Sequence, residues 1–216
     1  MDHTRHIGIF DASQWPVTLI GAGGIGAITA VILAKMGIPE ITVFDDDTVD
    51  DENLATQFYR IDDLGRPKVT ALEQLLHEFA DDLDVHARNG RVTPGIKGDM
   101  LLNPVIISAV DSINTRKEIW KVVQTLPFLW YLDARMGAEN LMLYCVPGSD
   151  RGWYEKALAS QDEDAIEDLP CTQKATIFTA SVAGGLIGKT VRQIVTGLEP
   201  PRLLFYNIIG DSLLIP

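Results

Sequence analysis

A short segment rich in carboxylates gives the first indication of chemistry. In residues 43–54, VFDDDTVDDENL, six of the twelve side chains are acidic, and the segment begins at the end of an apolar run. Upstream lies GAGGIG, at residues 21–26, where glycines allow the backbone to approach a phosphate closely. An acid at the end of the following strand accepts hydrogen bonds from ribose hydroxyls. The two segments predict a nucleotide site, although such a site needs about one acid here rather than six.

The glycine turn lies in the sequence context that phosphate binding requires. An apolar run at residues 17–20 predicts a buried strand, and residues 25–36 predict a buried helix that stops at Gly37. The first N–H groups of that helix and its dipole favour an anion, and Asp45 follows the next predicted strand, at residues 41–44. The alternative is a turn whose glycines serve only helix–sheet packing. The turn alone does not distinguish NAD, FAD and ATP.

Two later side chains favour ATP. Lys68 lies in the first turn of a helix that is expected to open at Pro67, and hydride transfer to a nicotinamide needs no lysine there. Cleavage of the α–β phosphate bond of ATP does need positive charge and a Mg²⁺ site. Asp111 directly follows the predicted strand at residues 104–110, at the edge where open α/β sheets bind ligands. It is the candidate Mg²⁺ ligand. The alternative, compatible role for Asp111 is to cap the next helix.

The order of elements predicts an α/β protein. The strand–helix–strand unit around the glycine turn implies parallel strands. We expect a Rossmann-like doubly wound sheet, parallel in its N-terminal part and with antiparallel strands at its C-terminal end. Further strands are expected at residues 83–87, 104–110, 128–134, 140–146, 202–207 and 212–215, and further helices at residues 67–79, 112–126 and 176–196. Residues 148–174 are polar and acidic and are expected to be an excursion.

Composition argues against several classes of protein. The chain has 216 residues, of which 46% are hydrophobic, and its formal net charge of −12 disfavours a nucleic-acid partner. No apolar run reaches the about 18 residues of a membrane span, and the N-terminus lacks the features of a signal peptide. The two cysteines, Cys145 and Cys171, form no C-x-x-C pair. A four-cysteine zinc site is therefore not expected, and the cytoplasm is the expected compartment.

Four motifs occur in a fixed order over about half of the chain. They are G-x-G-G-x-G at residues 21–26, D-x-D-x-V-x-x-x-N-L-x-x-Q at residues 45–57, G-x-P-K at residues 65–68 and D-x-x-x-x-R at residues 111–116. In this order they resemble the ubiquitin-activating-like adenylyltransferases of the ThiF, MoeB and HesA type. The resemblance implies a single adenylation domain over residues 1–216, with a crossover at residues 148–174.

The resemblance also implies an activity. Such enzymes use ATP and Mg²⁺ to adenylate the C-terminal glycine carboxylate of a ubiquitin-like or sulfur-carrier protein. Carried over to this chain, the phosphates would lie on the glycine turn and Lys68, the ribose on Asp45, and Mg²⁺ on Asp111. The residues implied in nucleotide binding are Gly21, Gly23, Gly24, Gly26, Asp45, Asp47, Asn53, Gln57 and Lys68. The other acids of the segment, Asp46, Asp50, Asp51 and Glu52, are expected to be solvated.

The chain departs from the family pattern at Thr56, where relatives commonly have an arginine. Arg60 and Arg66 are the candidates to replace it. The resemblance further implies that Arg5 reaches the site of a partner subunit, which requires a homodimer. Relatives use a crossover cysteine as an acyl acceptor, which makes Cys171 a candidate for a thioester, with a buried structural cysteine as the alternative. Cys145, in an apolar strand, is expected in the core.

Three other functions remain open from the sequence. One is a non-catalytic nucleotide-binding scaffold, against which the presence of both Lys68 and Asp111 argues. A second is an NAD-dependent oxidoreductase, which only the glycine turn supports. A third is an adenylyltransferase that acts on a small peptide.

Overall fold

The computed structural model describes residues 6, 8–96, 103–137, 140–161 and 176–215. Within them an eight-stranded sheet has the order β3-β2-β1-β4-β5-β6-β7-β8. Strands β1 to β5 pair parallel, and β6, β7 and β8 pair antiparallel. The predicted fold class is confirmed. The bounds are β1 (Val17–Ile20), β2 (Glu40–Asp45), β3 (Asp84–Asn89), β4 (Val105–Ser108), β5 (Trp130–Gly137), β6 (Asn140–Pro147), β7 (Leu203–Asn207) and β8 (Ser212–Leu214).

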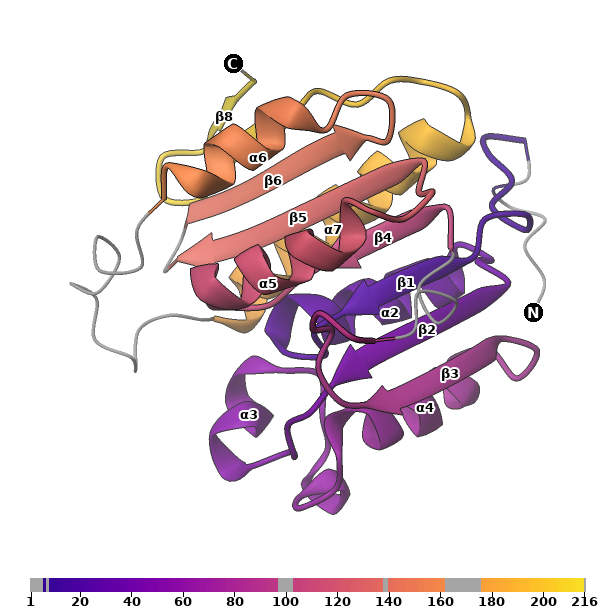
Figure 1. The fold of residues 1–216 in the computed structure, drawn as a ribbon. Coiled ribbons are helices and arrows are strands. Elements are labelled where there is room, and N and C mark those ends of the chain that lie inside the picture. Colours follow the sequence, from indigo (N-terminus) through magenta and orange to yellow (C-terminus); the bar gives the residue numbers. More distant parts are fainter. Residues whose placement is uncertain (1–5, 7, 97–102, 138–139, 162–175, 216) are drawn as a thin grey trace.

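Helices cover both faces of the sheet. Figure 1 shows α5 and α6 in front of the sheet and α2, α4 and α7 behind it, with α3 beyond one edge. Their bounds are α2 (Gly24–Lys35), α3 (Asp51–Thr56), α4 (Lys68–Phe79), α5 (Ile113–Val123), α6 (Gly152–Ala159) and α7 (Ile177–Val195), and a 3₁₀ helix, η1 (Ile61–Asp63), follows α3. This arrangement buries the central parallel strands on both faces.

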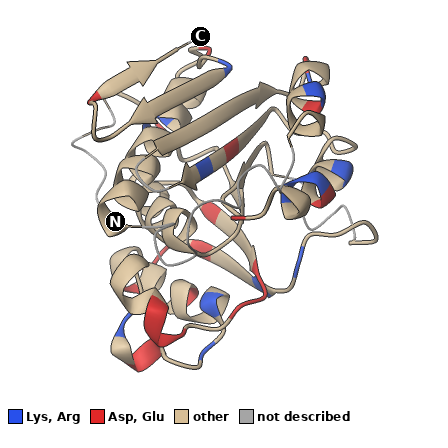
Figure 2. Cartoon of the chain, turned by 90° about the vertical axis from the view of Figure 1, so that its left-hand side faces the viewer, with Lys and Arg blue, Asp and Glu red and all other residues tan. Residues whose placement is uncertain are grey.

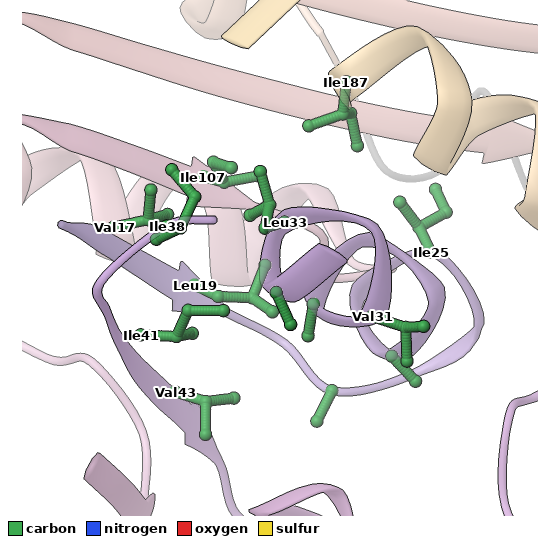
Figure 3. Close-up of a cluster of buried hydrophobic side chains, with 14 of the residues drawn as sticks. Val17, Leu19, Ile25, Val31, Leu33, Ile38, Ile41, Val43, Ile107 and Ile187 are labelled. Atoms are coloured by element: carbon green, nitrogen blue, oxygen red, sulfur yellow. The ribbon is translucent and has the colours of Figure 1, made fainter. Parts of the chain in front are cut away.

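The core explains why the central strands are continuously apolar. All four residues of β1 and of β4 are buried. On the face covered by α2, the side chains of Leu19, Val43 and Ile107 belong to one cluster with Leu33 of α2 and Ile187 of α7 (Figure 3). A second cluster, rich in aromatic rings, packs under α5 and α6. The two clusters hold the strand ends in fixed positions, and those ends carry the candidate site.

Some helical features differ from expectation. Pro67 is the N-cap of α4 and not its first helical residue. α6 lies inside the segment expected to be a polar excursion, because Tyr154 and Leu158 give it a buried apolar side. Asp50 is exposed, as expected, but it caps α3 instead of lying in a loop, and its side chain accepts a hydrogen bond from the N–H of Asn53 at 3.1 Å. Part of the acidic segment therefore builds a helix.

The carboxyl ends of the parallel strands meet at one edge of the sheet. Figure 2 faces this edge and shows acidic residues gathered on α3 and on the chain that leads into it. Residues 8–16 lead into the amino end of β1 and lie at the opposite edge (Figure 1). Within the described residues, no helix is both long and apolar enough to cross a membrane.

Candidate functional site

The turn between β1 and α2 requires glycine at two positions. Gly21 has φ +100°, and a Cβ there would lie 2.8 Å from the carbonyl oxygen of Ala109. A Cβ on Gly26 would lie 1.9 Å from the carbonyl oxygen of Gly21, so the start of α2 approaches the turn too closely for any side chain. Gly23 is the N-cap of α2, and no side chain caps this end. The first N–H groups of α2 can therefore bind a ligand anion.

Asp45 fixes the glycine turn to the end of β2. Its Oδ2 accepts a hydrogen bond from the N–H of Ala22 at 2.7 Å, and its Oδ1 accepts one from the N–H of Asp47 at 2.8 Å. Burial raises the pKa of Asp45, and these two N–H groups oppose that rise. Each carboxylate oxygen has a second lone pair, so both can also accept a hydrogen bond from a ribose hydroxyl.

Lys68 lies beside the same turn. Its ammonium group lies 2.9 Å from Oδ2 of Asp47, and its backbone N–H donates to the carbonyl of Asp47 at 2.9 Å. The Lys68 side chain is 7% exposed, while that of Asp47 is 61% exposed. Tyr59 adds a buried link, because its hydroxyl donates to the carbonyl of Ala22 at 2.6 Å and lies 3.4 Å from the carbonyl of Lys68. Lys68 is thus held next to the glycine turn.

α3 carries two of the predicted pocket residues. The Asn53 side-chain oxygen accepts a hydrogen bond from the N–H of Asp50 at 3.1 Å, which completes a capping box. Gln57 ends the helix, and its buried Oε1 has no hydrogen-bond partner among the described residues. A buried acceptor of this kind usually has a partner, so the Gln57 amide is a good candidate for contact with a ligand.

Asp111 lies just beyond β4 at the same edge and is exposed. The helix that follows, α5, is capped by Ser112, whose hydroxyl accepts a hydrogen bond from the N–H of Thr115 at 3.2 Å. The alternative capping role for Asp111 is therefore taken by its neighbour. This leaves the Asp111 carboxylate at the edge, next to the glycine turn, because the N–H of Ala109 donates to the carbonyl of Ile20 at 2.8 Å.

A network of buried polar side chains holds the loop that carries Asp111. Arg116 donates to the carbonyl of Val110 and to the carboxylate of Asp133, and both side chains of this ion pair are buried. Asp133 also accepts hydrogen bonds from Arg135 at 2.7 and 2.5 Å and from the Tyr154 hydroxyl at 2.7 Å. The motifs in the sequence did not predict this network. Its signal was an aspartate inside the apolar strand WYLDA, which a buried strand tolerates only with partners.

The two arginines proposed in place of the one missing at Thr56 are bound elsewhere. The Arg60 guanidinium contacts both Glu78 oxygens, at 2.6 and 2.8 Å, and Arg66 donates to the buried Asp63 at 2.8 Å. Arg91, which the sequence analysis did not consider, donates to Asp46 at 2.8 Å. Asp46 is exposed, as expected, and forms this ion pair at the surface.

A pocket of about 350 Å³ lies at the ends of β2 and β3, beside Asp45. It is large enough for part of a nucleotide. Its lining combines apolar and polar side chains: Phe44, Ala87, Arg88, Asn89, Gly90, Arg91 and Ile96. The N–H of Gly90 donates to the carbonyl of Asp45 at 3.0 Å, which fixes the lining loop against β2.

Two predicted site residues, Arg5 and Cys171, lie outside the described residues. Cys145 lies in β6 and is buried, as expected, and burial raises its pKa to about 12. A thiol with this pKa is protonated at neutral pH and is a poor nucleophile. Cys145 is therefore a residue of the core.

Comparison with known proteins identifies relatives along nearly the whole chain. The ThiF family model matches residues 8–213. Ubiquitin-like modifier-activating enzyme 5 of Dictyostelium discoideum is 25% identical over 224 residues, covering 90% of this chain and 56% of that protein. The sulfur carrier protein ThiS adenylyltransferase of Escherichia coli K12 is 26% identical over 190 residues, covering 87% of this chain and 71% of that protein. The chain thus spans only about half the length of the modifier-activating relatives.

Solved structures share the fold. PaaA has a TM-score of 0.72 at 20% sequence identity, over 94% of this chain and 73% of the PaaA chain. E. coli MccB with ATP has a TM-score of 0.70 at 17% identity, over 95% of this chain and 64% of that chain. The match to the family model confirms the resemblance seen in the four motifs. It shows that the chain belongs to the ThiF family.

Proposed function

We propose that this protein is an ATP-dependent adenylyltransferase that activates a carboxylate. The main observation behind this proposal is that one edge of the sheet brings together the glycine turn, Asp45, Lys68 and Asp111. In the reaction a carboxylate oxygen bonds to the α-phosphorus, the bond from that phosphorus to the bridging oxygen breaks, and pyrophosphate leaves. The nucleophile is already ionised, so no general base is required, and catalysis rests on positioning and charge neutralisation.

The residues at this edge have different roles in the proposed reaction. The glycine turn and the start of α2 hold phosphates, Asp45 holds the ribose, and the pocket beside β3 receives the base. Lys68 neutralises phosphate charge. Asp111 fits a Mg²⁺ ligand, because Mg²⁺ in such sites binds one or two carboxylates and the substrate phosphates. The bound ion would offset negative charge on the phosphates.

The substrate we propose is the C-terminal glycine carboxylate of a ubiquitin-like or sulfur-carrier protein. The names of the relatives in Dictyostelium and E. coli support this class. The alternative is a small peptide, which solved complexes of MccB with MccA support by similarity of fold. The charge of this chain, −12, fits a partner with a basic face around its C-terminus.

Isothermal titration calorimetry tests the nucleotide assignment. We expect saturable binding of MgATP and no binding of NAD or NADH, because Lys68 and Asp111 suit a triphosphate and its metal ion. Asp45→Ala should weaken MgATP, AMP and adenosine alike, since all three carry the ribose. Tight NAD binding without a MgATP signal would instead establish an oxidoreductase.

We further propose roles for the two residues outside the described ranges. Arg5 acts in the site of the partner subunit of a homodimer. The described part of the N-terminal segment supports this, since it lies at the edge of the sheet opposite the site (Figure 1). Cys171 accepts the acyl group from the adenylate as a thioester, with release of AMP.

Cys171→Ser should separate the two chemical steps. The variant is expected to keep substrate-dependent ATP–pyrophosphate exchange, because adenylation needs no thiol, and to lose any reductant-sensitive adduct with the substrate protein. Cys145→Ser is the matched control and should keep both, since Cys145 is buried in β6. If the wild-type protein adenylates its substrate well and forms no such adduct, Cys171 is not an acyl acceptor.

A further inference from the structure

Two cations contact the acidic loop after β2, and only one has a role so far. Lys68 contacts Asp47, and Arg91 contacts Asp46 through its Nε at 2.8 Å. The Arg91 and Asp46 side chains are 65% and 42% exposed. Arg91 lies just after β3, where the hydrogen bond from the Gly90 N–H to the Asp45 carbonyl holds the chain beside the ribose-binding residue. Arg91 also lines the pocket assigned to the nucleotide.

The charges around Arg91 define the space that its guanidinium can reach. Asp46 raises the pKa of Arg91, and Asp47 and Asp111 add to that effect. Asp47 holds Lys68, and Asp111 is the candidate Mg²⁺ ligand. Arg91 thus lies in the pocket lining beside Asp46, and Asp46 is the neighbour in sequence of Asp47, which holds Lys68.

The charges at this edge favour a further cation beside Lys68. A triphosphate and a carboxylate nucleophile are both anionic, and they would meet beside Asp45, Asp46, Asp47 and Asp111. Arg60 and Arg66 cannot serve without breaking contacts with Glu78 and with Asp63, which is 1% exposed. The contact of Arg91 is different, because it involves no buried carboxylate. Both side chains of the Arg91–Asp46 pair are exposed, and an exposed ion pair contributes little to stability.

We propose that Arg91 is a nucleotide-binding residue that leaves Asp46 when MgATP binds and donates to phosphate oxygens. The proposal rests on the proposed function and names the cation that Thr56 does not supply. A phosphate carries more charge than a single carboxylate, and the planar guanidinium can donate two parallel hydrogen bonds to it. Asp46 then serves to keep Arg91 oriented toward the pocket in the free protein.

Calorimetry with MgATP, AMP and adenosine tests this proposal. Arg91→Ala is expected to weaken MgATP binding about tenfold or more, the scale of losing hydrogen bonds to a charged group, and to leave adenosine binding unchanged. Arg91→Lys should recover part of the loss. Asp46→Asn should bind MgATP at least as tightly as the wild type, because the competing carboxylate is gone.

Arg202→Ala provides a matched control. Arg202, just before β7, and Asp150, in the loop before α6, form a similar ion pair, with side chains 61% and 46% exposed. This variant should bind MgATP as the wild type does. Equal MgATP affinity in the wild type and Arg91→Ala would overturn the proposal, as would a parallel loss of adenosine binding, which would assign Arg91 to the base. Failure of the wild type itself to bind MgATP would overturn the proposed function as well.

Discussion

Lys68→Ala is expected to reduce substrate-dependent ATP–pyrophosphate exchange by about 10²-fold or more, the scale of removing one preorganised electrostatic group from an active site. The Lys68 ammonium is buried beside the glycine turn and paired with Asp47. In the variant the developing charge on pyrophosphate would lose its neighbouring cation, and Asp47 would add repulsion. Exchange of radiolabelled pyrophosphate into ATP measures the effect.

Lys121→Ala is the control for this substitution. Lys121 is an exposed lysine on α5, paired with Glu118 at 2.5 Å, and its loss should leave exchange unchanged.

Asp111→Ala should resemble Lys68→Ala, and mixing it with Arg5→Ala protein should restore part of the activity if Arg5 acts across a homodimer. Exchange at the wild-type rate in both Lys68→Ala and Asp111→Ala would remove these residues from the mechanism.

Arg116→Met is expected to lower the free energy of unfolding by about 3–5 kcal/mol, as for other buried ion pairs that lose one partner. The substitution leaves the Asp133 carboxylate buried with one arginine fewer, and it leaves the Val110 carbonyl without its donor. Methionine keeps much of the volume, so the loss comes from charge and hydrogen bonding. Urea unfolding followed by circular dichroism gives the value.

Arg202→Met separates this effect from the loss of any arginine. Its partner Asp150 is exposed, so the change in unfolding free energy should stay within about 1 kcal/mol. A similar small change for Arg116→Met would mean that Arg135 and Tyr154 are sufficient partners for Asp133. The buried pair would then have no measurable part in holding the loop that carries Asp111.

Much of the fold could be predicted because the parallel strands are continuous apolar runs between turn signals. The apolar pattern correctly predicted strands β1, β2 and β4, and Gly37 indicated the end of the helix after β1. α6 could not be predicted in the same way. Its helical pattern is short, and what stabilises it is the packing of Tyr154 against Trp120 and Tyr131, from α5 and β5. Such contacts depend on tertiary structure.

The candidate site, too, could be predicted where local motifs define it, but not where tertiary structure brings residues together. The positions of Asp45 and Lys68 follow from local motifs, and the structure places both beside the glycine turn. Arg91 was missed, because it lies in no motif and comes near Asp46 only through the parallel pairing of β2 with β3. Arg60 and Arg66 were close in sequence to Thr56, but their hydrogen bonds turn them toward Asp63 and Glu78.

The environment of Asp45 also links binding to the pH dependence of folding. Because burial raises its pKa in the folded state, Asp45 contributes most to stability below its unfolded value of 3.8. That contribution is lost as the pH rises through the folded-state value. Above that folded-state value the ionised carboxylate lies where burial disfavours its charge. The ionised form is also the better acceptor for ribose hydroxyls, so this position lowers the stability of the empty protein in favour of recognition, and a bound nucleotide would restore stability by mass action.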